Sequence, residues 1–135
     1  MSDSTLATEY VADTIALVLR IERRKMGPAA KKAFEAVESG QVGLHLPGMV
    51  LAEILYLAER RRISASLQEV EEYLRRHPTC KEAPLGLAVI RSAVEISDIP
   101  ELHDQLIAAT ARQLHCVLVT NDPVIQASAF VKTVW

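Results

Sequence analysis

Four acidic residues of this 135-residue chain interrupt apolar segments, where a charged side chain is unexpected: Asp13, Glu53, Asp104 and Asp122. Asp13 follows the stretch Tyr-Val-Ala, and Asp122 follows Cys-Val-Leu-Val-Thr with one asparagine between. Glu53 and Asp104 lie at helical spacing from apolar residues of their own segments. A buried carboxylate is costly unless it is paired or bound to a metal. The sequence places no obvious buried base beside any of the four.

Convergence of these carboxylates would create a site for a hard cation. Two carboxylates ~4 Å apart repel by about 4 kcal/mol at an effective dielectric near 20, and a divalent ion relieves that repulsion. Magnesium suits such a site because it takes few carboxylates and keeps several waters. Taken singly, Asp13 and Asp122 are equally well explained as helix caps, Asp104 as a partner of a helix dipole and Glu53 as a solvated helix edge. The four together favour the cation site.

The elements that must position these residues follow from apolar periodicity and turn signals. Strands are expected at 10–12, 42–46, 79–85, 116–120 and 131–134, and helices at 14–25, 28–39, 47–62, 66–77, 86–95, 100–115 and 123–128. This alternation predicts an α/β fold with a mostly parallel sheet covered by helices on both faces. The length predicts a single domain over residues 1–135. Ligands of such sheets bind at the carboxyl ends of the strands, where Asp13 and Asp122 are expected.

The net charge, the absence of targeting signals and the spacing of the cysteines and histidines limit the possible classes of protein further. The net charge of −2, from 15 basic and 17 acidic residues, is not the strongly basic balance that marks a nucleic-acid binder by itself. No signal peptide or membrane-spanning segment is visible, so a cytoplasmic location is expected. Cys80 and Cys116 show no metal-ligand spacing, and neither do the four histidines. Cys116 opens an apolar run and is interpreted as a small buried residue.

Four segments of the chain resemble PIN domains, of the kind found in VapC-type toxins of prokaryotic toxin–antitoxin pairs. They are Tyr-Val-Ala-Asp13-Thr, Val-Leu-Ala-Glu53-Ile-Leu, Leu-His-Asp104-Gln-Leu-Ile-Ala-Ala-Thr-Ala and Leu-Val-Thr120-Asn121-Asp122. The resemblance implies a three-layer α/β/α fold and a Mg²⁺- or Mn²⁺-dependent endoribonuclease. The four acids match the family's acidic set, and Thr120 matches a hydroxyl residue near it.

The resemblance also implies partners: an RNA substrate, a second copy in a homodimer, and a small antitoxin protein. An antitoxin would do best by inserting an Arg or Lys near Asp13 and Asp104. Its apolar anchors are expected at Met49 and Tyr56 and along the 17–21 side of the first helix.

Two other classes of protein fit parts of the pattern. A non-catalytic RNA-binding or regulatory module of the same fold is the main alternative. A phospho-acceptor receiver domain also gathers acids at strand ends, but receivers typically carry adjacent acids after the first strand and a lysine after the last. Here Asp13 is followed by Thr14, and the only late lysine, Lys132, lies inside the final predicted strand.

Overall fold

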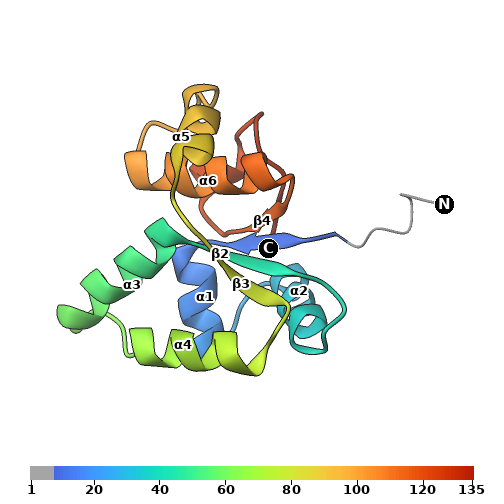
Figure 1. The fold of residues 1–135 in the computed structure, drawn as a ribbon, viewed down its shortest axis with the longest axis vertical. Coiled ribbons are helices and arrows are strands. Elements are labelled where there is room, and N and C mark those ends of the chain that lie inside the picture. Colours follow the sequence, from blue (N-terminus) through green and yellow to red (C-terminus); the bar gives the residue numbers. More distant parts are fainter. Residues whose placement is uncertain (1–7) are drawn as a thin grey trace.

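Five parallel strands form the centre of the computed structural model, which describes residues 8–135. Their order across the sheet is β3-β2-β1-β4-β5 (Figure 1). The strands are β1 (Tyr10–Ala12), β2 (Leu44–Pro47), β3 (Cys80–Ala83), β4 (Val117–Val119) and β5 (Thr133–Val134). The predicted edge strand is confirmed as β3, and Pro84 follows its last residue, where no ladder hydrogen bond is lost.

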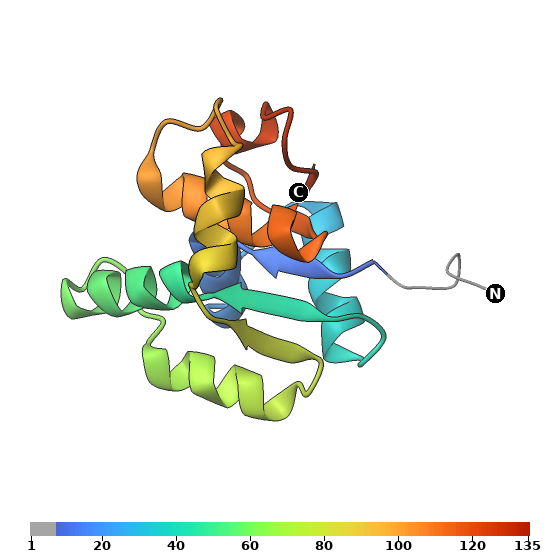
Figure 2. The same ribbon diagram turned by 45° about the horizontal axis from the view of Figure 1, so that its top comes forward.

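Helices cover both faces of the sheet and give the predicted three-layer α/β/α arrangement. One face carries α1 (Thr14–Ile21), α2 (Pro28–Glu38), α3 (Gly48–Glu59) and α4 (Leu67–Arg76). The other face carries α5 (Leu87–Val94) and α6 (Leu102–Leu114), and the short α7 (Pro123–Gln126) follows β4. Figure 2 shows β1, β2 and β3 side by side between the two helical layers. No helix within residues 8–135 is long and apolar enough to cross a membrane.

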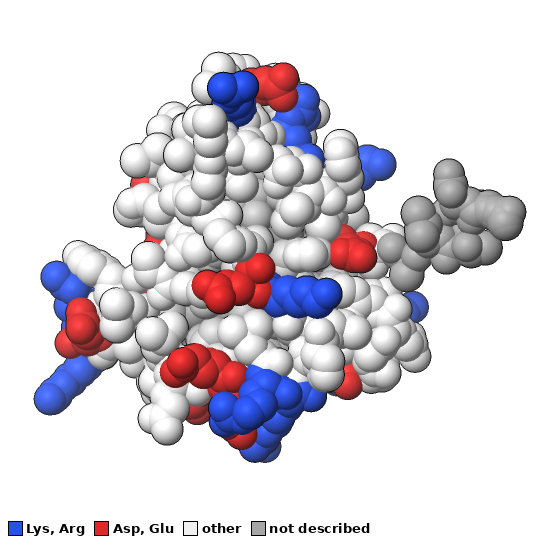
Figure 3. All heavy atoms as spheres, in the orientation of Figure 1, with Lys and Arg blue, Asp and Glu red and all other residues white. Residues whose placement is uncertain are grey.

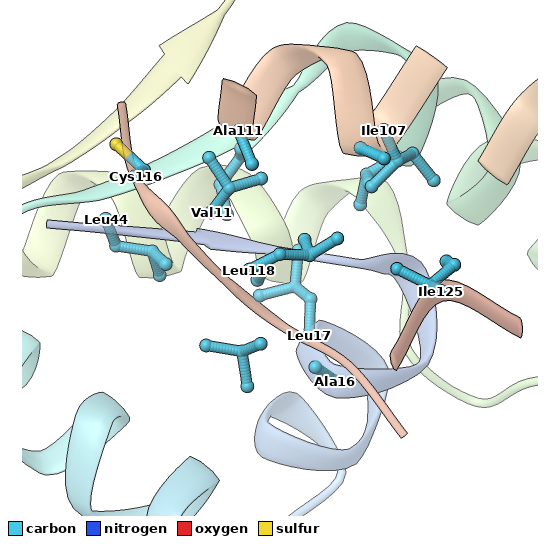
Figure 4. Close-up of a cluster of buried hydrophobic side chains, with 14 of the residues drawn as sticks. Val11, Ala16, Leu17, Leu44, Ile107, Ala111, Cys116, Leu118 and Ile125 are labelled. Atoms are coloured by element: carbon cyan, nitrogen blue, oxygen red, sulfur yellow. The ribbon is translucent and has the colours of Figure 1, made fainter. Parts of the chain in front are cut away.

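The core lies on both sides of β1 and β4. Val11 and Leu118 are fully buried beneath Ile107 and Ala111 of α6, and Leu17 of α1 lies on the opposite side (Figure 4). Burial of both faces explains why the segment around β4 is a continuous apolar run without alternation. Leu17 is completely buried, so the expectation that it anchors a partner is wrong.

The register between β1 and β4 sets the position of the residues that follow them. Ala12 pairs with Val119, and the main-chain N–H of Asp13 donates to the carbonyl of Val119 at 3.1 Å. Asp13 and Thr120 therefore leave the sheet side by side at its carboxyl edge.

Several predicted boundaries are wrong. The third helix ends at Glu59 instead of residue 62, where Arg61 adopts a left-handed conformation with φ 56°, and the last strand begins at Thr133 instead of residue 131. The first helix ends at Ile21 instead of residue 25, since Arg23 adopts a left-handed conformation with φ 57°. The Glu22 carboxylate there accepts hydrogen bonds from the main-chain N–H groups of Ser64 and Ala65, at 2.8 and 3.0 Å. The second strand covers Leu44–Pro47, two residues later than its predicted start.

The first testable prediction concerns the core around β4. Leu118→Ala should lower the free energy of unfolding by about 2–5 kcal/mol, because the side chain is fully buried and its removal leaves a cavity. Leu102→Ala is the matched control, since Leu102 is 58% exposed and should change stability by less than about 0.5 kcal/mol. Urea unfolding measures both, and equal effects would contradict this description of the core.

Candidate functional site

Asp13 is the N-cap of α1 and is only 6% exposed. Its Oδ1 accepts the main-chain N–H of Ala16 at 2.9 Å, and the Thr120 hydroxyl donates to the same carboxylate. Burial raises the pKa of Asp13 to about 6, because desolvation, aided by the charges of Asp122 and Glu53, outweighs these hydrogen bonds. Asp13 is therefore a carboxyl group that is fixed in place and that ionises at a higher pH than an ordinary aspartate.

Asp122 caps the short α7 in the same way. Its Oδ1 accepts the main-chain N–H groups of Val124 and Ile125, at 2.9 and 3.1 Å. Its own N–H donates to the hydroxyl oxygen of Thr120 at 3.1 Å. Thr120 is fully buried and bonds to both Asp13 and Asp122, so it fixes the two acids relative to each other.

Glu53 reaches the same edge from α3. The hydroxyl of Thr14, the first residue of α1, donates to its Oε1. Its other oxygen, Oε2, lies 3.4 Å from Nδ1 of His103 on α6. The Glu53 carboxylate thus links the start of α1 to the start of α6.

Asp104 lies in the first turn of α6 and is partly buried. Its main-chain N–H donates to Glu101 at 2.8 Å, and no hydrogen bond to its own carboxylate comes from residues 8–135. Burial, together with the charges of Asp122, Glu101, Glu53 and Asp13, raises its pKa to about 6. The structure therefore brings all four predicted acids within electrostatic reach of one another.

Sequence reasoning missed Glu101 as a fifth acid of this group. It is the N-cap of α6 and raises the pKa of Asp104, and its Oε2 lies 3.5 Å from Nδ1 of His103. The available signal was an acid next to Pro100 and three residues before Asp104, because a cap side chain accepts the main-chain N–H of the residue three positions later.

The donor chemistry of the acidic group fits a hard divalent ion. Carboxylate oxygens are the ligands that Mg²⁺ and Mn²⁺ prefer, and the pKa values of Asp13 and Asp104 are raised first by burial and then by the charges of the neighbouring acids. Within residues 8–135, however, the acids do not form a set of three whose ligand atoms all lie within 4.8 Å of one another. One different set does meet that spacing: Glu9, His45 and Cys116.

The chain belongs to the PIN domain family, because a family model of the PIN domain matches residues 10–131. Its fold is also similar to solved structures of low sequence identity. VapBC2 from Rickettsia felis, bound to a DNA fragment from its promoter, has a chain with 17% identity and a TM-score of 0.72, covering 94% of this chain and 98% of that one. DNA-bound VapBC from Salmonella typhimurium has 15% identity and a TM-score of 0.68, with coverages of 95% and 98%.

FitAcB from Neisseria gonorrhoeae has 16% identity and a TM-score of 0.62, with coverages of 92% and 95%. At these identities the similarity shows a shared fold. No curated protein matches the sequence.

The second prediction follows from the raised pKa of Asp104. A carboxyl whose pKa is raised from 3.8 to about 6 on folding destabilises the fold as pH rises through that interval. In the presence of chelator at about pH 7.5, Asp104→Asn should therefore have a higher free energy of unfolding than the unmodified protein. The difference should disappear below about pH 4.

Asp98→Asn is a control for which the change in the free energy of unfolding should have the opposite sign. Hydrogen bonds from Ala129 and Ser128 lower the pKa of Asp98, so its loss should reduce stability at neutral pH. A stability difference for Asp104→Asn that does not change between these pH values would contradict the electrostatic interpretation.

Proposed function

We propose that this protein is a metal-dependent endoribonuclease that hydrolyses RNA phosphodiester bonds and acts as the toxin of a toxin–antitoxin pair. The observation that supports the proposal is that Asp104 lies close enough to Asp13, Glu53 and Asp122, each from a different segment of a PIN-domain fold, for their charges to raise its pKa. Asp13 and Asp104 have raised pKa values, in part because of the charges of the neighbouring acids, and such a group of acids is suited to binding a metal.

Asp13, Glu53, Asp104 and Asp122 would hold Mg²⁺ or Mn²⁺, with direct contact assigned to Asp13 and Asp104. An ion bound there supplies charge neutralisation for the phosphate and lowers the pKa of an attacking water.

The chain's own hydroxyl groups orient these acids. Thr120 holds Asp13 and the main chain of Asp122, while Thr14 holds Glu53. These bonds reduce the freedom of the carboxylates and preserve their arrangement between turnovers.

A groove of mixed charge provides basic residues for the RNA backbone. It lies where α1 ends, α2 begins and α4 ends, and Arg20 there is paired with Glu38. Its lining also includes Glu69 and Glu72, and the basic lining residues assigned to phosphate contacts are Arg23, Arg24, Lys25 and Lys31. The chain as a whole is acidic, and Figure 3 shows charges of both signs interspersed on one face. Local clustering therefore has to provide the phosphate contacts, and these weaken as salt rises.

The third prediction tests catalysis. Asp104→Asn should lower the rate of Mg²⁺-dependent cleavage of a mixed RNA pool by at least about 100-fold, since loss even of a group that only supports a metal costs 10–100-fold. Asp98→Asn replaces an exposed aspartate outside the acidic group and should retain the rate. RNA binding without cleavage by the unmodified protein in Mg²⁺ and in Mn²⁺ would instead favour a non-catalytic RNA-binding module.

Two exposed apolar surfaces are available for the proposed partners. On α3, Leu55 and Tyr56 are 44% and 52% exposed and lie within three residues of Glu53. On α5, Leu87, Ile90 and Val94 are exposed, and Figure 3 shows a largely uncharged surface over much of α5 and α6. We assign the α3 surface to the antitoxin, because it adjoins the acids, and the α5 surface to a homodimer contact.

The fourth prediction concerns the antitoxin, taken as the product of a short reading frame beside the gene. An inserted Arg or Lys would occupy the place of the metal, so excess Mg²⁺ should weaken the complex. Tyr56→Ala should weaken it without altering that competition, because Tyr56 carries no charge and its ring stacks with Arg60 of the same helix. Binding affinity measured with and without Mg²⁺ tests the idea; unchanged affinity together with full nuclease activity in the complex would overturn it.

A further inference from the structure

Three potential metal ligands meet at the amino edge of the sheet, opposite the acidic group. Glu9 precedes β1, His45 lies in β2, and Cys116 precedes β4. The carboxylate oxygen, imidazole nitrogen and thiol sulfur of these residues all lie within 4.8 Å of one another. In Figure 4 Cys116 stands at the far end of β4 from Ile125, which follows the acidic edge.

The parallel register explains why these three residues share one face of the sheet. Tyr10 pairs with Leu44 on one side and with Val117 on the other, so Glu9 lies beside Cys116 and next to Gly43. Side chains alternate along a strand, and His45 is two residues beyond Gly43. The three side chains therefore point to the face covered by α6, at its carboxyl end.

Local packing leaves room for the Glu9 carboxylate at this place. A Cβ atom on Gly43 would lie only 3.0 Å from Glu9 Oε1, so the absence of a side chain there admits the carboxylate. The same Oε1 is 2.6 Å from Nε2 of His45. Cys116 is buried, and desolvation, aided by the charge of Glu9, raises the pKa of its thiol to about 11.

We infer that Glu9, His45 and Cys116 form a binding site for a borderline transition-metal ion of the Zn²⁺ class, distinct from the acidic site and independent of the proposed nuclease activity. Ligand atoms around tetrahedral zinc lie roughly 3.3–3.8 Å apart, given bond lengths of about 2.0–2.3 Å. The present spacing requires only that the Glu9–His45 hydrogen bond open and that the sulfur approach.

Charge and donor type select this class of ion. One carboxylate, one thiolate and one neutral imidazole balance a divalent charge, and the thiol proton passes to solvent as the metal binds. Nitrogen and sulfur donors favour Zn²⁺ over Mg²⁺, which prefers oxygen alone. The three residues line a pocket of about 920 Å³ that admits water as a fourth ligand. Lys81 and Lys132 also line this pocket, and neither belongs to the three-residue ligand group.

Cobalt is the probe, because a thiolate–Co²⁺ bond gives a near-ultraviolet charge-transfer band that carboxylate sites do not give. The chelator-treated full-length protein, kept reduced, is titrated with CoCl₂ and then with ZnCl₂. We expect one equivalent of Co²⁺ to produce the band and Zn²⁺ to displace it. Binding of Co²⁺ or Zn²⁺ at the acidic edge leaves the band unchanged.

Cys116→Ser should abolish the band, and Cys80→Ser, the matched change at the other buried cysteine, should retain it. His45→Gln and Glu9→Gln should each weaken Zn²⁺ binding by at least about 10-fold, because each removes one ligand of three. If Cys116→Ser does not fold, the Zn²⁺ affinities of His45→Gln and Glu9→Gln test the proposed site instead. A band absent from the unmodified protein, a band retained in Cys116→Ser, or unchanged affinity in both His45→Gln and Glu9→Gln would overturn the inference.

Discussion

The parallel pairing of β1 with β4 is the constraint on which the rest of the structure depends. It makes both strands end at the same edge, so that the residues after Ala12 and Val119 emerge side by side. Asp13 and Asp122 then cap α1 and α7, and each uses one carboxylate oxygen to bind main-chain N–H groups. Because the caps hold them in place, the two acids cannot rotate apart to relieve their repulsion. The helix caps are therefore observed, and they are compatible with the proposed metal site because each cap uses only one oxygen of its carboxylate.

The two edges of the sheet offer different chemistry. The carboxyl edge gathers carboxylates from the end of β1, from α3 and α6 and from the β4–α7 turn, and their charges contribute to the raised pKa values of Asp13 and Asp104. The amino edge brings together one oxygen, one nitrogen and one sulfur. The hardness of the ligands therefore separates the proposed Mg²⁺ or Mn²⁺ site from the proposed Zn²⁺ site, and occupancy of one does not require the other.

The sequence predicted the fold class and the approximate place of every strand and helix in the described residues. It succeeded because apolar periodicity, the Ser66 capping box and the prolines are local signals. It failed at the end of α1, because the contact from Glu22 to residues 64 and 65 is a tertiary one. Asp13, Glu53, Asp104 and Asp122 were identifiable because each is a charge in an apolar setting.

The amino-edge group was not identifiable in this way. Glu9, His45 and Cys116 are separated by 36 and 71 residues, and no spacing rule for metal ligands covers such intervals. Only the register of β1 with both β2 and β4 brings them together. Cys116 was correctly predicted to be buried, but burial alone does not show which side chains surround the sulfur.

The central claim is that the acidic group is held together against its own repulsion and that a divalent metal relieves it. NMR titration of the side-chain carboxyl carbons of Asp13 and Asp104, with and without Mg²⁺, tests it most directly. The account predicts that both carboxyls titrate near the raised pKa of about 6 in the metal-free protein. With saturating Mg²⁺ the pKa of each should fall below the ordinary value of 3.8. Titration of both groups near 3.8 in the metal-free protein, unchanged by Mg²⁺, would contradict it.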